Sequence, residues 1–367
     1  MKIQRIDIFH IAIPLLYTFE TSFGIVDQRP AIVVKVTTGD GRIGFGESSP
    51  LYMPISESEV LADSMKTLSA LMPKLIGANI DSIEDLLHIF DQTRGYPITK
   101  IGIEGAYFDL IAQEKNQPLF TVFGGHNRVL SIGESIGIKQ NAIAIVQEIR
   151  TKIEEGYKSV KIKIKPGYDF SIVQYARKEF PDITLGVDAN AAYAPRDISI
   201  LKSLDQFNLA FIEQPFGSQD MESHVLLQKD ITTPICLDES IVDFANCKRA
   251  IEMGACRIIN IKPARIGSFH VAKKIHDYCV EQGIPLFGGG RMETGLGKTI
   301  NTHFFALPGF TMPADMTPPL AYFPEDIIEP PLKVIRGEVR LPEIAGLGVM
   351  VNESVIEKYS QEHISFK

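Results

Sequence analysis

The stretch that decides the fold lies within residues 159–263, where short apolar segments each end at a charged residue. Four of its strings are I-T-L-G-V-D at 183–188, L-A-F-I-E-Q-P at 209–215, I-C-L-D-E-S at 235–240 and R-I-I-N-I-K-P at 257–263. The charged residues that close the segments lie 25, 25, 25 and 24 positions apart, and they are Lys163, Asp188, Glu213, Asp238 and Lys262. One charged residue per repeat at a fixed phase indicates consecutive β/α units, whose strand ends meet at a single rim.

The same alternation of short apolar strands and helical segments continues on both sides of this stretch. Apolar segments near 132–138, 284–288 and 311–314 add further strands, and segments such as 142–155, 169–179, 242–253 and 268–282 carry helical spacing. Together they predict an α/β fold built on a parallel β/α barrel. A doubly wound open sheet is the alternative, but no strand is followed by the G-x-G-x-x-G turn that is typical of that fold.

The two ends of the chain do not follow the barrel pattern. Residues 2–13 and 31–38 read as strands, whereas 57–75, 82–94 and 100–115 read as helices. We therefore expect an α+β capping domain over 1–125, the barrel over 126–322, and a C-terminal segment over 323–367 that returns to the cap. A strand pair is expected near 333–340.

Bulk properties exclude several classes of function. The chain has 367 residues, 45% hydrophobic and 22% charged residues, and a formal net charge of −8. This charge argues against nucleic acid or an anionic membrane as a partner, and no apolar run is long enough to span a bilayer. The four cysteines form no C-x-x-C pair, which favours a reducing, cytoplasmic compartment. We also expect a homo-oligomer.

The three strand-end acids predict a metal site. Asp188, Glu213 and Asp238 would repel one another if they shared a rim without a cation, and all-oxygen ligands suit Mg²⁺, with Mn²⁺ as a possible substitute. A structural alternative is that each acid caps a helix N-terminus. The equal spacing, with a lysine at each end of the series, favours the metal site.

The flanking lysines predict acid–base chemistry. Lys163 and Lys262 lie on the two outer strands of the five-strand series, so they would face each other across a bound substrate. Lys161 points to the same side of its strand as Lys163, and a neighbouring cation together with desolvation lowers the pKa of a lysine from about 10.4. Lys165 shares this phase, so spacing alone does not decide which lysine is the base.

Weaker candidates lie beside these positions. Asn190 either assists the metal or substrate or is a turn residue, and Glu239 either orients a lysine or caps a helix. The run G-G-G-R-M-E-T-G-L-G at 288–297 would let backbone approach the substrate.

These residues resemble the enolase superfamily, in its muconate-lactonising-enzyme-like subgroup. The resemblance covers essentially the whole chain and is closest to the o-succinylbenzoate synthases and N-succinylamino acid racemases. Its strings are T-S-F-G at 21–24, P-L-Y at 50–52, K-I-K-I-K-P-G at 161–167, D-A-N-A-A-Y at 188–193, E-Q-P at 213–215, D-E-S at 238–240, N-I-K-P-A-R-I-G at 260–267 and E-T-G-L-G at 293–297.

The resemblance implies a (β/α)₇β barrel of the TIM type and a role for each site residue. Asp188, Glu213 and Asp238 would hold the metal, Lys163 and Lys262 would be the opposing acid–base pair, and Lys161 an auxiliary. Cap loops near 18–24 and 48–55 would close over a small carboxylate substrate. The residues expected to bind that substrate are Asn190, Glu20, Ser22, Tyr52, Arg291 and Glu293.

The implied reaction begins with removal of the proton α to the substrate carboxylate, through an enediolate. Dehydration to o-succinylbenzoate, a step of menaquinone biosynthesis, is the first expectation. Racemisation of N-succinyl- or other N-acylamino acids, or epimerisation of dipeptides, is the alternative. A non-catalytic binding protein is disfavoured because all five rim residues are present.

Two positions depart from the pattern of these relatives. Glu20 stands where a basic residue is frequent, and Arg291 replaces an apolar residue in G-G-R-M-E-T-G. Glu20 would repel a succinyl carboxylate, whereas Arg291 would supply a positive charge from the barrel side.

Overall fold

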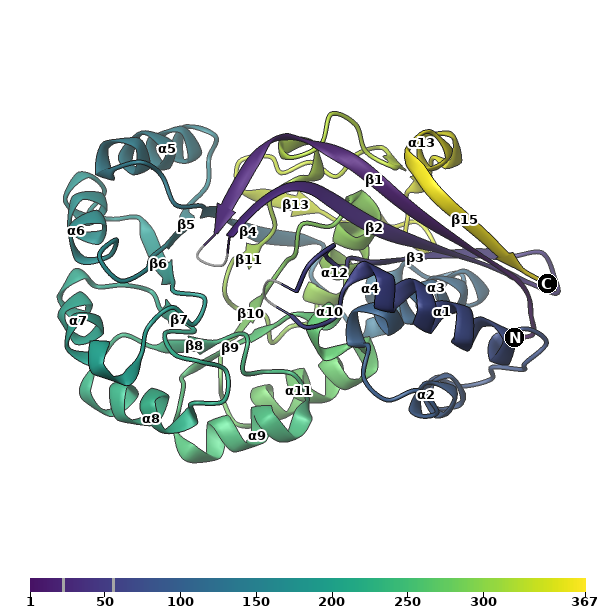
Figure 1. Cartoon of the computed structure of the whole chain (residues 1–367), viewed down its shortest axis with the longest axis horizontal. Coiled ribbons are helices and arrows are strands. Elements are labelled where there is room, and N and C mark those ends of the chain that lie inside the picture. Colours follow the sequence, from purple (N-terminus) through teal and green to yellow (C-terminus); the bar gives the residue numbers. More distant parts are fainter. Residues whose placement is uncertain (22–23, 55–56) are drawn as a thin grey trace.

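The computed structural model describes residues 1–21, 24–54 and 57–367, without the side chains of 19–27. An antiparallel sheet in the order β15-β1-β2-β3 and a barrel sheet dominate it (Figure 1). The antiparallel sheet consists of β1 (Ile3–Thr21), β2 (Gly24–Thr38), β3 (Ile43–Ser48) and β15 (Ser360–Phe366). The first and last segments of the chain therefore share one sheet.

One face of this sheet packs on helices of the N-terminal part. These helices are α1 (Leu61–Leu75), α2 (Ile83–Asp91), α3 (Pro97–Glu114) and α4 (Leu119–Phe123). Ile6, Ile8 and Val34 project from the strands into an apolar cluster with Leu68 and Leu71 of α1. Alternation along β1 points Ile6 and Ile8 into this cluster and Phe9, Ile11 and Ile13 into the larger core cluster on the other face.

Strand β3 packs unusually close to α3. A Cβ atom on Gly46 would lie 1.9 Å from the carbonyl oxygen of Gly102, a distance that no side chain can accept. Glycine at 46 is therefore required for this contact, which seats α3 against the sheet.

Eight parallel strands form the barrel in the part of the chain that the structure describes. In chain order they are β4 (Val129–Ile136), β5 (Ser159–Lys163), β6 (Thr184–Asp188), β7 (Ile212–Glu213), β8 (Ile235–Leu237), β9 (Ile258–Ile261), β10 (Leu286–Gly288) and β11 (Ala314–Asp315). Isolated parallel bridges, Leu286–Phe310 and Gly289–Asp315, join the segments of β10 and β11 and complete the ring. The predicted barrel is confirmed, with β7 and β11 shorter than expected.

Helices surround the ring on its outer face (Figure 1). They are α5 (Ala142–Glu154), α6 (Phe170–Glu179), α7 (Ile198–Ser203), α8 (Met221–Asp230), α9 (Phe244–Met253), α10 (Pro263–Ile266), α11 (Phe269–Glu281) and α12 (Gly295–Phe305). The sequence predicted α5, α6, α9 and α11 to within two residues at each end. It did not predict α12, which is buried on all sides and so lacks the polar face on which helical spacing depends. None of the helices in the described part of the chain is both long and apolar enough to cross a membrane.

The C-terminal segment contacts both parts of the molecule. It contains β12 (Ile328–Glu329), β13 (Glu338–Arg340), β14 (Met350–Val351) and α13 (Glu353–Tyr359). The strand pair expected near 333–340 is reduced to a single antiparallel bridge between Ile335 and Glu338, and β13 pairs antiparallel with β4 of the barrel. Strand β15 then pairs with β1. The segment thus extends the barrel sheet before it reaches the cap.

A buried carboxylate joins the cap helix α3 to barrel helix α11. The Glu104 carboxylate accepts hydrogen bonds from Ser268 Oγ at 3.0 Å and from the backbone N–H of His270 at 2.9 Å. Its second oxygen has no hydrogen-bond partner among the described residues. Burial raises the pKa of Glu104 to about 7.

We predict a pH dependence of stability from Glu104. Its carboxyl binds a proton in the folded state up to pH near 7 but in the unfolded chain only up to its ordinary value of 4.5. The contribution of Glu104 to the free energy of unfolding is therefore full below pH 4.5. It falls, by on the order of 3 kcal/mol, as pH rises to 7. Glu104→Gln should gain stability relative to the unmodified chain between pH 5 and 8 in urea unfolding. Glu281→Gln, at the exposed end of α11, is the control, and parallel pH profiles for Glu104→Gln and the unmodified chain would contradict the assignment.

Candidate active site

The charged residues at the strand ends converge at one rim of the barrel. Lys161 and Lys163 extend from β5, Asp188 and Glu213 end β6 and β7, and the remaining two residues, Asp238 and Lys262, directly follow β8 and β9. The register pairs Lys163 with Asp188 and Asp188 with Glu213 on neighbouring strands. Alternation along β5 turns both of its lysines inward, as the sequence predicted.

Each acid of the rim is buried and ion-paired. Lys163 Nζ donates to Asp188 Oδ2 at 2.6 Å, and Lys262 Nζ donates to Asp238 Oδ2 at 2.7 Å. Lys161 Nζ donates to Glu213 Oε2 at 2.9 Å. Asp188, Glu213 and Asp238 form a row along the rim. The two candidate acid–base lysines are thus held by the acids at opposite ends of this row.

Glu213, at the centre of the row, has less compensating positive charge around it than Asp188 has. Burial, together with repulsion from Asp188 and Asp238, raises the pKa of Glu213 well above its usual range despite the attraction of Lys161. Burial also acts to raise the pKa of Asp188, but Lys163 and Lys161 outweigh it and hold that pKa well below the usual range. The central acid therefore needs additional positive charge to remain ionised at neutral pH.

The lysine pKa shifts run opposite to the direction expected from the sequence. Burial lowers the pKa of Lys161 and of Lys262, but the surrounding carboxylates outweigh it, so that both values rise. The expectation of a lowered pKa assumed a cation that neutralises the acids. The rise reflects three acids whose charge is balanced by the lysines themselves.

The donor set fits a divalent cation chemically. Within the described ranges, no three carboxylate, imidazole or thiol groups stand together as a ready metal cage, because the carboxylates are turned to ammonium and guanidinium groups. Even so, three fully buried carboxylates on consecutive strands, one of them short of positive charge, are the oxygen ligands that Mg²⁺ prefers. Asp188, Glu213 and Asp238 are therefore the residues that would hold it.

Four further residues belong to the rim, and the sequence analysis did not assign them to it. Asp315 accepts from Lys161 at 2.7 Å, Asn260 donates to Glu213 at 2.9 Å, and Arg265 pairs with both Asp238 and Glu57. Asn260 precedes Lys262 by two positions on one strand, so period-two alternation could have placed it. Glu57 carries no such signal, because it comes from a cap loop.

The predicted substrate-binding residues are only partly brought together. Asn190 lies in the rim, where its Oδ1 accepts from Lys163 Nζ at 2.7 Å. Tyr52 is 43% exposed and stacks edge-on against His10 at 6.2 Å between ring centroids. Glu20 lies in β1, but its side chain is outside the described set, and Ser22 lies outside the described residues altogether.

Arg291 and Glu293 lie on the segment between β10 and α12. The Arg291 guanidinium donates to Glu57 Oε1 at 2.6 Å and to the Ser49 carbonyl at 3.3 Å. Glu293 accepts from the backbone N–H of Arg291 at 2.9 Å and from the Asn301 amide at 3.3 Å. The positive charge of Arg291, expected to face substrate, is therefore directed to the cap loop.

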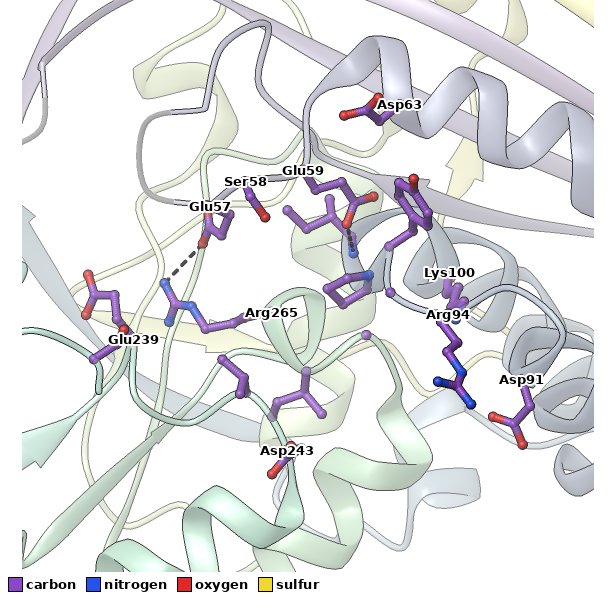
Figure 2. Close-up of a pocket in the computed structure, with 18 residues that line it drawn as sticks. Glu57, Ser58, Glu59, Asp63, Asp91, Arg94, Lys100, Glu239, Asp243 and Arg265 are labelled. Atoms are coloured by element: carbon purple, nitrogen blue, oxygen red, sulfur yellow. Dashed lines mark hydrogen bonds and ion pairs between the residues drawn. The ribbon is translucent and has the colours of Figure 1, made fainter. Parts of the chain in front are cut away.

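A cleft of about 1070 Å³ lies beside the rim, between cap and barrel. Figure 2 shows Glu57 and Arg265 joined across it, with Glu239 on the barrel side and Asp63 and Lys100 on the cap side. Carboxylates outnumber cationic groups among its lining residues. Of the rim residues, Arg265 and Glu57 line the cleft, together with Glu239, which directly follows Asp238.

We predict that Arg291 stabilises the cap loop through Glu57. Arg291→Met should lower the free energy of unfolding by about 1–2 kcal/mol, because it removes a charged hydrogen bond of a mostly buried carboxylate. Glu57→Gln should weaken the same contact, so the double variant should be less destabilised than the sum of the singles in urea unfolding. Arg128→Met, which breaks an exposed pair with Glu343, should change little. Additive effects would exclude the coupling.

Comparison with known proteins identifies the architecture. The mandelate racemase / muconate lactonizing enzyme N-terminal domain matches residues 4–124, and the enolase C-terminal domain-like family matches residues 144–355. The N-succinylamino acid racemase of Thermus thermophilus is 36% identical over 98% of this chain and 97% of its own length. The o-succinylbenzoate synthase of Geobacillus stearothermophilus is 37% identical over 98% of this chain and 96% of its own.

Solved structures agree with these relatives. An enolase superfamily member from Listeria innocua superposes with a TM-score of 0.96 at 33% identity, covering 100% of this chain and 99% of that one. A dipeptide epimerase from Enterococcus faecalis, complexed with Mg and the dipeptide L-Leu-L-Tyr, superposes with a TM-score of 0.89 at 27% identity, covering 95% and 99%. These relatives include enzymes of the lyase and isomerase classes.

Proposed function

Because the chain belongs to the mandelate racemase / muconate lactonizing enzyme family of the enolase superfamily, we propose that it removes the proton α to a substrate carboxylate with the help of bound Mg²⁺. The main reaction proposed is dehydration to o-succinylbenzoate, in menaquinone biosynthesis. The observation that supports proton transfer is that Lys163 and Lys262 donate to Asp188 and Asp238, the acids at opposite ends of one buried row.

The acids and the lysines of the rim would have different roles in this reaction. Asp188, Glu213 and Asp238 would bind Mg²⁺, which when bound stabilises the negative charge that develops on the substrate carboxylate by several kcal/mol. Lys163 is placed to take the α-proton on one side of the row. Both Lys161 and Lys163 are buried.

Dehydration then needs a leaving hydroxyl on the β-carbon. The α C–H bond breaks toward the lysine, its electron pair forms the new double bond, and the β C–O bond breaks. A proton from an ammonium group lets the hydroxyl depart as water, so the net change is loss of H₂O. Lys262, on the opposite side of the row, can supply this proton, because its ammonium group is held by Asp238 and its pKa is raised.

Racemisation of N-succinyl- or N-acylamino acids is the second candidate, and one specific observation favours it. A second lysine on the far side can return a proton to the face opposite the one that lost it. Dehydration needs no proton returned to the α-carbon, because there the second lysine protonates only the leaving hydroxyl. A relative of 36% identity is named an N-succinylamino acid racemase, and one of 37% identity an o-succinylbenzoate synthase. These relatives support both reactions as candidates.

Incubation with each substrate class in deuterated buffer separates the two reactions. The purified chain with Mg²⁺ should convert the β-hydroxy acid precursor to an aromatic product, followed by ultraviolet absorbance. With N-succinylamino acids, mass spectrometry should show deuterium at the α-carbon and loss of optical purity if racemisation occurs. Absence of both product formation and α-proton exchange, with Mg²⁺ present, would overturn the proposed function.

A further inference from the structure

Lys163 has a neutral acceptor as well as a carboxylate. Its Nζ donates to Asp188 Oδ2 at 2.6 Å and to Asn190 Oδ1 at 2.7 Å. These two acceptors fix the direction of the amine on a side chain with many rotamers. The Asn190 amide is therefore part of what aims the base at the substrate.

The Asn190 amide can serve Lys163 in only one of its two orientations. Its oxygen must face Lys163, which leaves its NH₂ group to face other acceptors. Nδ2 donates to Glu239 Oε1 at 3.1 Å and makes a longer contact with Asp188 Oδ2 at 3.4 Å. A half-turn of the amide would aim NH₂ at the ammonium group and a carbonyl oxygen at the Glu239 carboxylate, and both contacts are repulsive.

Glu239 does not cap the helix that follows it. The helix that follows it, α9, is capped by Asp243, whose side chain accepts from the backbone N–H of Asn246 at 2.7 Å. The helix-cap interpretation of Glu239 is therefore wrong. Its carboxylate lies at the edge of the cleft (Figure 2), and its Oε2 atom is buried without a hydrogen-bond partner among the described residues.

We infer that Glu239 is a positioning residue that locks the Asn190 amide so that its oxygen holds Lys163 toward the substrate. The inference rests on the proposed function, since it concerns the lysine on one side of the row. Lys262 Nζ donates to Asp238, the acid at the other end of the row. The lock therefore acts on one face of the substrate.

The two faces of an N-succinylamino acid give the test an internal control. Lys163→Ala first identifies the enantiomer whose α-proton Lys163 removes. Glu239→Leu, which removes the acceptor, should slow deuterium exchange of that enantiomer about tenfold and leave exchange of its mirror image nearly unchanged. Glu239→Gln keeps an oxygen acceptor at the same place and should restore most of the lost rate.

A merely structural role would give a different pattern. General damage to the rim, or to the adjacent Asp238, would slow both enantiomers equally and weaken Mg²⁺ binding in calorimetry. Either equal slowing or a Glu239→Gln variant as slow as Glu239→Leu would overturn the inference. If the unmodified chain with Mg²⁺ exchanges neither enantiomer and forms no dehydration product, the proposed function itself has failed.

A crystal structure supplies a readout that does not depend on activity. In Glu239→Leu the contact between Asn190 Oδ1 and Lys163 Nζ, 2.7 Å in the unmodified chain, should lengthen beyond about 3.5 Å as the amide rotates. In Glu239→Gln it should persist. An unchanged contact in Glu239→Leu would refute the lock, whatever the substrate proves to be.

Discussion

Glu213→Ala should abolish Mg²⁺-dependent turnover while leaving the chain folded. Glu213 is fully buried and lies between Asp188 and Asp238 in the row, so its loss would leave only two of the three proposed metal ligands. Several kcal/mol of charge stabilisation would be lost, which corresponds to a decrease of about 10³-fold or more in kcat. Turnover at saturating Mg²⁺ and metal affinity by calorimetry measure the effect.

The fold should survive this substitution for an electrostatic reason. Lys161 keeps Asp315 as a partner at 2.7 Å, and removal of Glu213 relieves its repulsion with the two flanking acids. The midpoint of thermal unfolding should therefore change little. Glu213→Gln, which keeps an oxygen at the same place, separates loss of charge from loss of volume, and Glu222→Ala at the exposed start of α8 is the control. Normal turnover of Glu213→Ala in the presence of a chelator would exclude the assignment.

Lys163→Ala and Lys262→Ala should each remove proton transfer on one side of the substrate. A positioned acid or base contributes about 10²–10⁴-fold to a rate, so each substitution should slow α-proton exchange by that factor. With N-succinylamino acids, each variant should lose exchange from one enantiomer only. With the dehydration substrate, Lys163→Ala should block the first step, which can be followed by retention of the α-proton in deuterated buffer.

Lys165→Ala is the matched control for Lys163. Both residues belong to the K-I-K-I-K run and share its phase, which is why spacing could not choose between them. In the structure Lys163 is buried against Asp188, whereas Lys165 lies beyond the end of β5 and is partly exposed. Lys165→Ala should retain activity, and a loss as large as that of Lys163→Ala would contradict the choice of base.

The barrel and the positions of its charged rim follow from the amino-acid sequence alone. Strand and helix lengths repeat regularly, and buried parallel strands are apolar until their ends, so a charged residue at constant phase marks each strand end. Lys163, Asp188, Glu213, Asp238 and Lys262 could therefore be assigned to one rim without coordinates. Helix α12 was not predicted, because it is buried on all sides and therefore lacks the apolar–polar periodicity on which such predictions depend.

The partners of these residues depend on how distant parts of the chain fold together. Glu57 reaches Arg265 and Arg291 from a cap loop, more than 200 residues away in the chain, and nothing local marks such a contact. Arg291 was expected to face the substrate, but its guanidinium is engaged by this distant carboxylate. Likewise, Glu239 could be a helix cap or a positioning group until Asp243 was seen to cap α9. Periodicity reports the face on which a side chain lies, whereas its partner depends on how remote segments fold together.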